Sequence, residues 1–266
     1  MDLLQTKTDI GRVREQNEDT VLAVKHPKSK NIKLLLAADG MGGREKGEVA
    51  SSFVASSIEK WFCGKSTKIL ENLNKTEELL KVYIKTLNTK LIKKYGKDKL
   101  GTTLILAIIN KENTLIMNVG DSRCYIYKNK RLIQVSEDNS DVWDYYKYGK
   151  VKKDHLRFFA NSSIITSCVG ICEELCTITS YVIDNRYDIL LLLTDGVTDN
   201  LMDKKIKSMI QKGPKVEILS NLIQEAVNKD QHYKVPLCLK RKYTTNYTIP
   251  FPGRDNASGA IYIKEV

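Results

Sequence analysis

Residues 31–43 read NIKLLLAADGMGG and say more about the fold than any other stretch of the chain. The apolar run over residues 34–38 has the length and continuity of a strand that is covered on both faces. It ends in Asp39, and three of the next four residues are glycines, which let a backbone approach a ligand closely. We therefore expect a buried strand that carries an acid into a site.

The Asp39-Gly40 pair has a second interpretation, because Asp-Gly is also a common two-residue hairpin turn. A hairpin would need a returning strand directly afterwards. Instead, apolar residues recur at helical spacing from Val49 to Trp61 and predict a helix over about residues 46–62. The sequence therefore favours a strand that leads through a glycine-rich loop into a helix.

The same arrangement recurs at residues 188–199, DILLLLTDGVTD, where an apolar run ends in Asp195 and a helix-like stretch follows. A weaker instance ends in Asp121. There Tyr125 and Tyr127 follow in alternation, so a hairpin turn is equally consistent with that stretch.

Acids also precede two more predicted strands. Glu18 and Asp19 stand before residues 20–24, and Asp255 stands before residues 260–263. Acids at the ends of several strands can converge at one end of a sheet, although they are far apart in the sequence.

The remaining pattern predicts strands and helices in alternating groups. A strand is expected over residues 3–10 and a second helix over about residues 75–95. Four strands with short turns between them read as an antiparallel meander over residues 102–109, 113–119, 123–128 and 131–135. Further strands are expected over about residues 163–169, 176–183 and 188–194, and further helices over about residues 203–211 and 215–228. This order predicts an α+β fold in which an antiparallel double sheet lies inside outer helices.

Two segments depart from this regular pattern. Residues 139–161 mix aromatic and charged side chains and predict a flap, a short helical excursion outside the sheet. Residues 230–254 show no period, which is long for a structureless loop and indicates a functional or disordered segment.

Length and composition fit a single domain over residues 1–266, since 42% of the residues are hydrophobic. No apolar run approaches the roughly 18 residues of a membrane span, and no signal sequence follows Met1. Six cysteines in a chain of this length do not predict a disulfide framework. We expect a soluble cytoplasmic protein with reduced thiols and no membrane partner.

The formal net charge is +11, from 43 Lys and Arg against 32 Asp and Glu. Such a charge attracts phosphorylated or other acidic partners. The basic residues are scattered, however, and neither a helix-turn-helix nor a ribonucleoprotein motif nor a compact basic helix is present in the sequence. We expect no nucleic-acid partner.

Residues 11–19, GRVREQNED, combine two arginines with acids in one polar loop. A guanidinium binds phosphate through two parallel hydrogen bonds, and neighbouring carboxylates suit a hard divalent ion. Taken alone, the loop also fits a solvated charged turn.

Cysteine and histidine give little support for a soft-metal site. Cys168, Cys172 and Cys176 are four residues apart, which is not the spacing of a usual cysteine pair site, and no fourth ligand is apparent. The three histidines, at positions 26, 155 and 232, stand outside every motif. We expect no cysteine-based metal cluster.

Six motifs, in this order along the chain, resemble those of metal-dependent protein serine/threonine phosphatases of type 2C: TDIGRVREQNED, AADGMGG, GTT, VGDSR, LLTDGVTD and RDNAS. The match runs from about Thr8 to the C-terminus and is similar to the bacterial members. The resemblance implies a four-layer α-β-β-α sandwich whose two central antiparallel sheets hold a binuclear Mn²⁺ or Mg²⁺ centre at one end.

The resemblance also implies roles for particular residues. Asp39 looks like the carboxylate that bridges both ions, and Gly40 looks like the donor of a backbone carbonyl. Asp195 and Asp255 would bind one ion. Glu18 would hold the other, directly or through water.

Four more positions match the family's motifs. Arg14 is similar to the arginine that grips the substrate phosphate, and Asp19 stands beside the ligands as an acid of the surrounding layer. Asp121 and Asp199 match positions that hold a third, weaker metal in some members.

The chemistry of the residues agrees with this resemblance. Carboxylate ligands without His or Cys favour hard, oxygen-seeking ions over zinc. Two such ions can generate a hydroxide nucleophile near neutral pH, so the expected reaction is direct attack by a water that bridges two metal ions. The sequence has no cysteine-based phosphatase loop, and no phosphoenzyme is expected.

The chain departs from the family pattern at four places. Met41 stands where many eukaryotic relatives have a histidine proposed as general acid, so the leaving oxygen would take its proton from water. Asp138-Asn139 replaces an Asp-His pair, and Ser258 is a mild change in the last motif. Residues 231–252 look like an insert, which either helps to select phosphoprotein substrates or is a solvated loop.

We therefore expect a phosphoprotein phosphatase that acts on phosphoserine and phosphothreonine, opposes a serine/threonine kinase and is a monomer. Two alternatives use the same fold. One is a catalytically silent phospho-binding or regulatory module, although such modules lose metal acids that are all present here. The other is a phosphatase of small metabolites, whose site chemistry would be identical.

Overall fold

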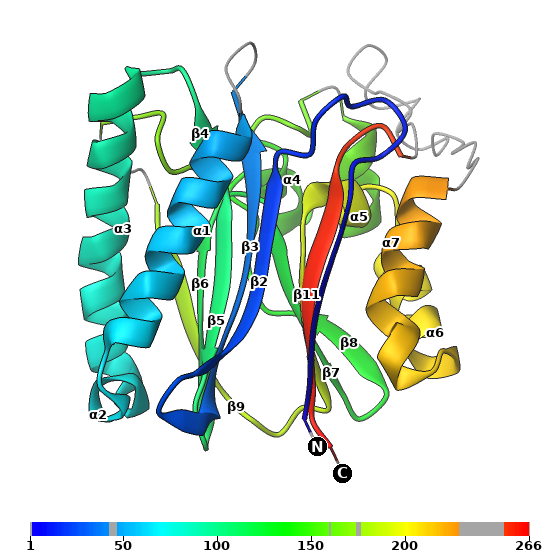
Figure 1. Ribbon diagram of the computed structural model, residues 1–266. Coiled ribbons are helices and arrows are strands. Elements are labelled where there is room, and N and C mark those ends of the chain that lie inside the picture. The colour runs from blue at the N-terminus through cyan, green and yellow to red at the C-terminus, as the bar shows by residue number, and fades with distance from the viewer. Residues whose placement is uncertain (1, 43–46, 160, 174–176, 229–252, 266) are drawn as a thin grey trace.

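Two antiparallel sheets face each other, and helices cover the outer face of each (Figure 1). The computed structural model describes residues 2–42, 47–159, 161–173, 177–228 and 253–265. The expected four-layer α-β-β-α sandwich is confirmed. The predicted insert at 231–252 lies outside the described residues, as do Gly43, Cys176 and His232.

The first sheet has five strands in the spatial order β1-β11-β10-β7-β8. Their bounds are Leu3–Asp9 (β1), Ala257–Ile263 (β11), Ile189–Leu193 (β10), Arg123–Lys128 (β7) and Arg131–Gln134 (β8). The second sheet has the order β2-β3-β5-β6-β9, and β4 also pairs with β3. Its strands are Asp19–His26 (β2), Ser29–Met41 (β3), Leu104–Ile109 (β5), Asn113–Val119 (β6), Thr179–Asp184 (β9) and Gly101–Thr102 (β4).

Helices on the two outer faces come from different parts of the chain. The second sheet is covered by α1 (Gly47–Gly64), α2 (Thr67–Glu71) and α3 (Leu73–Tyr95). The first sheet is covered by α5 (Asp195–Thr198), α6 (Asp203–Lys212), the 3₁₀ helix η2 (Lys215–Glu217) and α7 (Ile218–Asn228). Residues 139–161 contain α4 (Trp143–Lys147) and the 3₁₀ helix η1 (Lys153–Phe158), which share a small apolar core of their own.

Strand alternation divides the side chains of β3 between two cores. Leu34 and Leu36 pack with α1 and α3 on the outer face, whereas Leu35 and Ala37 pack between the sheets. Successive side chains of a strand point to opposite faces, so Asp39 continues the inter-sheet series. The strand therefore carries its acid into the space between the sheets, at one end of the sandwich.

The predicted meander is wrong in one respect. β6 pairs with β5 and β9 in the second sheet, whereas β7 pairs with β8 and β10 in the first. Residues 120–122 thus carry the chain from one sheet to the other, and the hairpin interpretation of Asp121 is wrong as well. Local alternation specifies a strand but not the sheet to which the strand belongs.

Two smaller differences concern short segments. The strand expected at 163–169 forms only isolated bridges, Ser140 with Ile165 and Thr102 with Val169. The helix α2 was not predicted, because its five residues are too few to show a helical period. No described helix is both long and apolar enough to cross a bilayer.

At the end of the sandwich opposite Asp39, the same face of β3 presents Lys33. Its ammonium lies 3.0 Å from Oδ2 of Asp2 and 5.1 Å from the centroid of the Tyr262 ring. The Tyr262 hydroxyl donates to the same Asp2 oxygen at 2.9 Å. This ion pair, in which the lysine is buried and the acid partly exposed, ties the start of the chain to β3 of the other sheet.

Truncating Leu192, which is 0% exposed between the sheets, should lower the free energy of unfolding by about 2–5 kcal/mol, because a cavity remains in a packed core. Urea denaturation of Leu192→Ala would measure this. The control is Val82→Ala on α3, where the side chain is 63% exposed and the change should stay within about 0.5 kcal/mol. Equal effects at the two positions would contradict the packing described.

Candidate active site

A cavity of about 300 Å³ opens at the end of the sandwich where β3 ends. Residues from several distant stretches line it: Arg14, Glu18, Asp39, Gly40, Met41, Gly42, Thr103, Asp121, Ser163, Ile165, Asp195 and Asp255. The residues predicted for the site are therefore brought together here, with two exceptions: Asp199 lines an adjoining pocket, and Asp19 lines neither.

The backbone of Asp39 is held by the two threonines of the GTT motif. The Asp39 amide donates to Oγ1 of Thr103 at 3.0 Å, and the Thr103 amide donates to the Asp39 carbonyl at 2.9 Å. The Thr102 hydroxyl donates to the same carbonyl at 2.9 Å. Thr103 also shares a 2.9 Å hydroxyl contact with Ser122, next to Asp121. The GTT motif is evident in the sequence, but the sequence alone did not reveal that its threonines anchor Asp39.

Gly40 is required by a close approach of three backbone segments. A Cβ at this position would lie 2.3 Å from the Gly47 carbonyl oxygen and 2.5 Å from the Glu18 carbonyl oxygen. The Gly40 amide donates to that Glu18 carbonyl at 3.1 Å. Absence of a side chain therefore lets the end of β3, the start of α1 and the Glu18 loop meet.

Glu18 is fixed at both its backbone and its carboxylate. Its amide donates to Oδ1 of Asn256 at 2.8 Å, and its Oε1 accepts the Gly47 amide at 2.7 Å. Asn256 also donates from Nδ2 to the carbonyls of Ile10 and Gln16. Asn256 thus organises the loop that carries Arg14 and Glu18, a role that sequence reasoning missed.

Asp195 and Asp255 are brought together by a second glycine contact. A Cβ on Gly196 would lie 1.9 Å from the carbonyl oxygen of Asn256, so the backbones after the two acids touch. Asp255 Oδ2 accepts a hydrogen bond from Nη2 of Arg14 at 2.8 Å. Arg14 Nη1 lies 3.9 Å from Oε2 of Glu18. One guanidinium therefore faces acids from two different loops.

The model of the protein phosphatase 2C family matches residues 12–229 of this chain. The chain belongs to that family. This confirms the family that the six motifs predicted. Asp255 lies beyond the matched residues, so its place in the site rests on the contacts just described.

Similar proteins are bacterial phosphatases of the same family. The serine/threonine phosphatase stp of Listeria welshimeri is 30% identical over 210 residues, which are 77% of this chain and 81% of that protein. The crystal structure of Stp1, a serine/threonine phosphatase from Staphylococcus aureus, has 28% identity and a TM-score of 0.79, and covers 100% of this chain and 96% of its own. The catalytic domain of the phosphatase PstP, in complex with 2 manganese ions, shares the fold at 22% identity and a TM-score of 0.75, over 98% of this chain and 97% of its own.

Burial, and after it repulsion among the acids, governs the electrostatics of this candidate site. Burial, followed by the charges of Asp255 and Asp199, raises the pKa of Asp195 to about 7. Burial and the charge of Asp195 hold the pKa values of Asp39 and Asp121 well above their ordinary range. The metal-free site therefore favours protons on several of its acids.

The donor set fits divalent metal ions of the hard type. Oδ1 of Asp195 and Oδ1 of Asp19 are buried and have no hydrogen-bond partner among the described residues. Carboxylate oxygens with unsatisfied lone pairs and raised pKa values are stabilised by Mg²⁺ or Mn²⁺. No three Asp, Glu, His or Cys side chains in the described part of the chain form a ready-made cation cage. Asp255 is instead engaged by Arg14.

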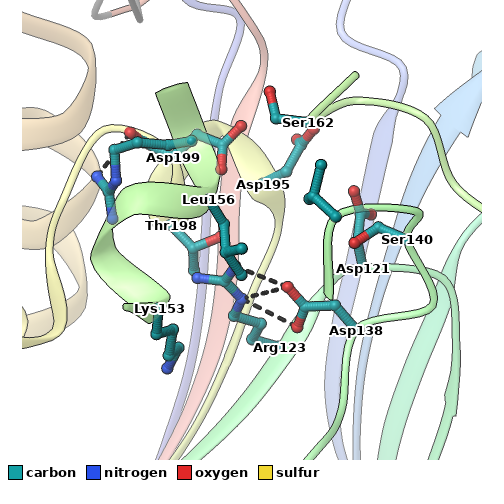
Figure 2. Close-up of a pocket in the computed structure, with 12 residues that line it drawn as sticks. Asp121, Arg123, Asp138, Ser140, Lys153, Leu156, Ser162, Asp195, Thr198 and Asp199 are labelled. Atoms are coloured by element: carbon teal, nitrogen blue, oxygen red, sulfur yellow. Dashed lines mark hydrogen bonds and ion pairs between the residues drawn. The ribbon is translucent and has the colours of Figure 1, made fainter. Parts of the chain in front are cut away.

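A second, smaller pocket of about 20 Å³ adjoins the cavity, with Asp121 and Asp195 common to both (Figure 2). It has room for about one water molecule. Asp199 lines this pocket, and Nη1 of Arg157 donates to the Asp199 carbonyl at 2.7 Å. Asp121 and Asp199, the two residues predicted to hold a third metal ion, thus line the same small pocket.

The Asp138-Asn139 pair has a structural role in this chain. Asp138 accepts hydrogen bonds from Nε and Nη2 of Arg123 at 2.9 and 2.6 Å, a buried two-point ion pair (Figure 2). Asn139 exchanges two hydrogen bonds with Gly120, through its side chain and its backbone amide. The departure from Asp-His thus leaves the turn before Asp121 firmly held.

Neither described histidine lines the cavity. His26 is buried against Phe62, where its Nε2 contacts the Lys65 carbonyl, and His155 lies on η1. In the described residues, Cys168 and Cys172 included, no cysteine takes part in a candidate metal-binding group.

The raised pKa values make metal-free stability depend on pH. Asp195, with a pKa of about 7, and Asp19, raised to about 8 by burial, bind protons in the folded state that they lose near pH 4 when unfolded. This contribution is complete below pH 4 and disappears as pH rises through 7 and 8. In chelator, the free energy of unfolding should fall from pH 5 to pH 7 by about 1.4 kcal/mol per pH unit for each such proton.

Urea denaturation at several pH values would measure this slope, which Asp195→Asn should flatten. Asp184→Asn is the control, because hydrogen bonds from Arg186 lower the pKa of Asp184 and it does not titrate in this window. Added Mn²⁺ should raise the Tm more at pH 8 than at pH 5, since protons compete with the metal. A stability that rises between pH 5 and pH 7 in chelator would contradict the prediction.

Proposed function

We propose that this chain is a metal-dependent phosphoprotein phosphatase that hydrolyses phosphoserine and phosphothreonine. The observation that carries the proposal is the convergence of Asp39, Asp195, Asp255 and Glu18 on one cavity that Arg14 also lines. A phosphate dianion requires positive charge, and these acids can retain metal ions that supply it.

Under this proposal the cavity acids have distinct tasks. Asp39 would hold both of two Mn²⁺ or Mg²⁺ ions, Asp195 and Asp255 would hold one of them, and Glu18 and the Gly40 carbonyl would complete the set. When bound, the ions would activate a bridging water for direct attack and neutralise charge on the phosphoryl oxygens. Asp121 and Asp199 would hold a third ion beside the small pocket.

Arg14 is the residue that changes partner during the reaction. Its guanidinium, which now donates to Asp255 Oδ2, is partly exposed at the cavity wall. A substrate phosphate would take two parallel hydrogen bonds from it, which would leave Asp255 free to hold a metal ion. The exchange keeps the total charge of the site balanced as substrate and metal enter.

Asp19 and Met41 are the two further residues to which the proposal gives a role. The Asp19 carboxylate accepts a hydrogen bond from Thr194 Oγ1 at 3.0 Å, and its strand position pairs with Asp39, so it can orient groups behind the bridging acid. Met41 lines the cavity and has no proton to donate. The departing serine or threonine oxygen therefore takes its proton from water.

The natural substrates would be products of a serine/threonine kinase in the cytoplasm, and the enzyme would act as a monomer without nucleic-acid or membrane partners. A silent binding module and a metabolite phosphatase are the alternatives. The complete set of acids speaks against the first. Comparing the rates on a phosphorylated peptide with those on small phosphate esters tests the second alternative, the metabolite phosphatase.

Hydrolysis of p-nitrophenyl phosphate and of a phosphothreonine peptide with Mn²⁺ tests the proposal. Turnover should stop with chelator, and Asp39→Asn and Asp195→Asn should each reduce kcat by at least about 100-fold, because metal and charge positioning are lost. Arg14→Ala should mainly raise the KM for the peptide.

The control variant is Asp184→Asn, which removes an acid that is 43% exposed at the far end of the second sheet and should retain wild-type rates. A folded wild-type protein that turns over neither substrate with any divalent ion would support the silent module instead. Turnover of small esters without any of the peptide would support the metabolite phosphatase.

A further inference from the structure

Lys153 is a lysine of the flap that is largely buried away from the catalytic cavity. It begins η1, and its side chain is only 15% exposed. Its ammonium donates to Oδ2 of Asp203 at 2.6 Å and lies 5.2 Å from the centroid of the Tyr125 ring. A lysine seldom gives up this much hydration unless an ion pair and an aromatic face replace it.

Asp203, which accepts this hydrogen bond, belongs to the main sandwich and not to the flap. Asp203 stands in the first turn of α6, and its Oδ1 accepts the Tyr125 hydroxyl at 2.9 Å. Tyr125 is fully buried on β7. Burial alone would raise the pKa of Asp203, but Lys153 and Tyr125 hold that pKa below its ordinary value, so Asp203 carries its negative charge at neutral pH.

A second cation of η1, Arg157, contacts the same segment of the main sandwich, residues 199–203. Arg157, four residues after Lys153, donates from Nη1 to the carbonyl of Asp199, which stands four residues before Asp203. Residues 199–203 directly follow α5, the short helix that begins at Asp195. The flap is thus fastened at two points to residues 199–203, which include Asp199 and directly follow the helix of Asp195.

The flap also reaches the wall of the catalytic cavity. Ser140 forms an isolated bridge with Ile165, and Ser163 and Ile165 line the cavity. Figure 2 shows Arg123, Asp138 and Lys153 along the lower edge of the small pocket, with Asp195 and Asp199 above them. Any shift of η1 against residues 199–203 would therefore move the wall that faces an entering substrate.

We propose that Lys153 and Asp203 form a positioning latch that holds the flap, residues 139–161, at a fixed distance from the acid-bearing turn and thereby supports binding of phosphoprotein substrates. The latch rests on the proposed function and adds to it a determinant of substrate size. A small aryl phosphate reaches the acids without touching the flap. A phosphorylated segment of a protein extends beyond the cavity and contacts its wall.

Steady-state kinetics with saturating Mn²⁺ on phosphorylated casein and on p-nitrophenyl phosphate test the latch. Asp203→Asn keeps an acceptor for Tyr125 but removes the charge that holds Lys153, and Lys153→Met removes the cation. Each should lower kcat/KM for casein by about tenfold, mostly through KM, because a charge-assisted contact is lost. The rate on the aryl phosphate should change less than about twofold.

Two controls separate positioning from general damage. Lys152→Met alters the exposed neighbour of Lys153 and should leave both substrates unaffected, and Lys153→Arg should restore most of the casein activity. Asp203→Asn leaves every tryptic site of the flap in place, so faster tryptic cleavage within 139–161 would report its release directly.

Equal losses on both substrates would overturn the latch, because they indicate a purely structural role. So would wild-type kinetics in both variants. If wild-type protein hydrolysed neither substrate, the proposed function would fail separately, and the tryptic comparison would still decide whether Asp203 holds the flap. An unchanged rate of tryptic cleavage within 139–161 in Asp203→Asn would then reject the latch.

Discussion

Carboxylates repel one another more strongly between two apolar sheets than in water, and this chain gathers several of them there. Asp39 and Glu18 come from the second sheet, whereas Asp195 and Asp255 come from the first. Repulsion therefore acts across the interface of the sandwich itself. Arg14 offsets part of it, and protons or cations must offset the rest.

Hydrogen bonds from uncharged residues hold the acid-bearing loops against this repulsion. Thr103 fixes Asp39, Asn256 fixes the loop before Glu18, and Asn139 fixes the turn before Asp121. Each of these three contacts uses a backbone group of the acid or of its neighbour rather than a carboxylate oxygen of that acid. The opposite end of the sandwich, where Lys33 pairs with Asp2, carries a balanced charge and needs no ligand.

Much of this arrangement could be predicted from local sequence. Apolar runs such as residues 34–38 and 189–193 identify buried strands, and an acid one or two residues after each run points to the candidate site. The sheet to which β6 and β7 belong could not be predicted, since alternation is the same in either sheet. Nor could the roles of Thr103 and Asn256, because an ordinary polar residue gains its meaning only from the backbone that folding brings beside it.

The proposed latch between Lys153 and Asp203 links side chains outside the cavity to the position of the cavity wall. Lys153 reads in the sequence as one more lysine of a strongly basic chain, yet it is buried against Tyr125 and Asp203. A flap with its own small core, Trp143, Leu156 and Phe158 among its residues, can move as a unit unless it is tied down. Fastening it to residues 199–203 couples its position to Asp195 and Asp199, which lie at the two ends of α5, and so links the acids to the surface that a protein substrate would meet.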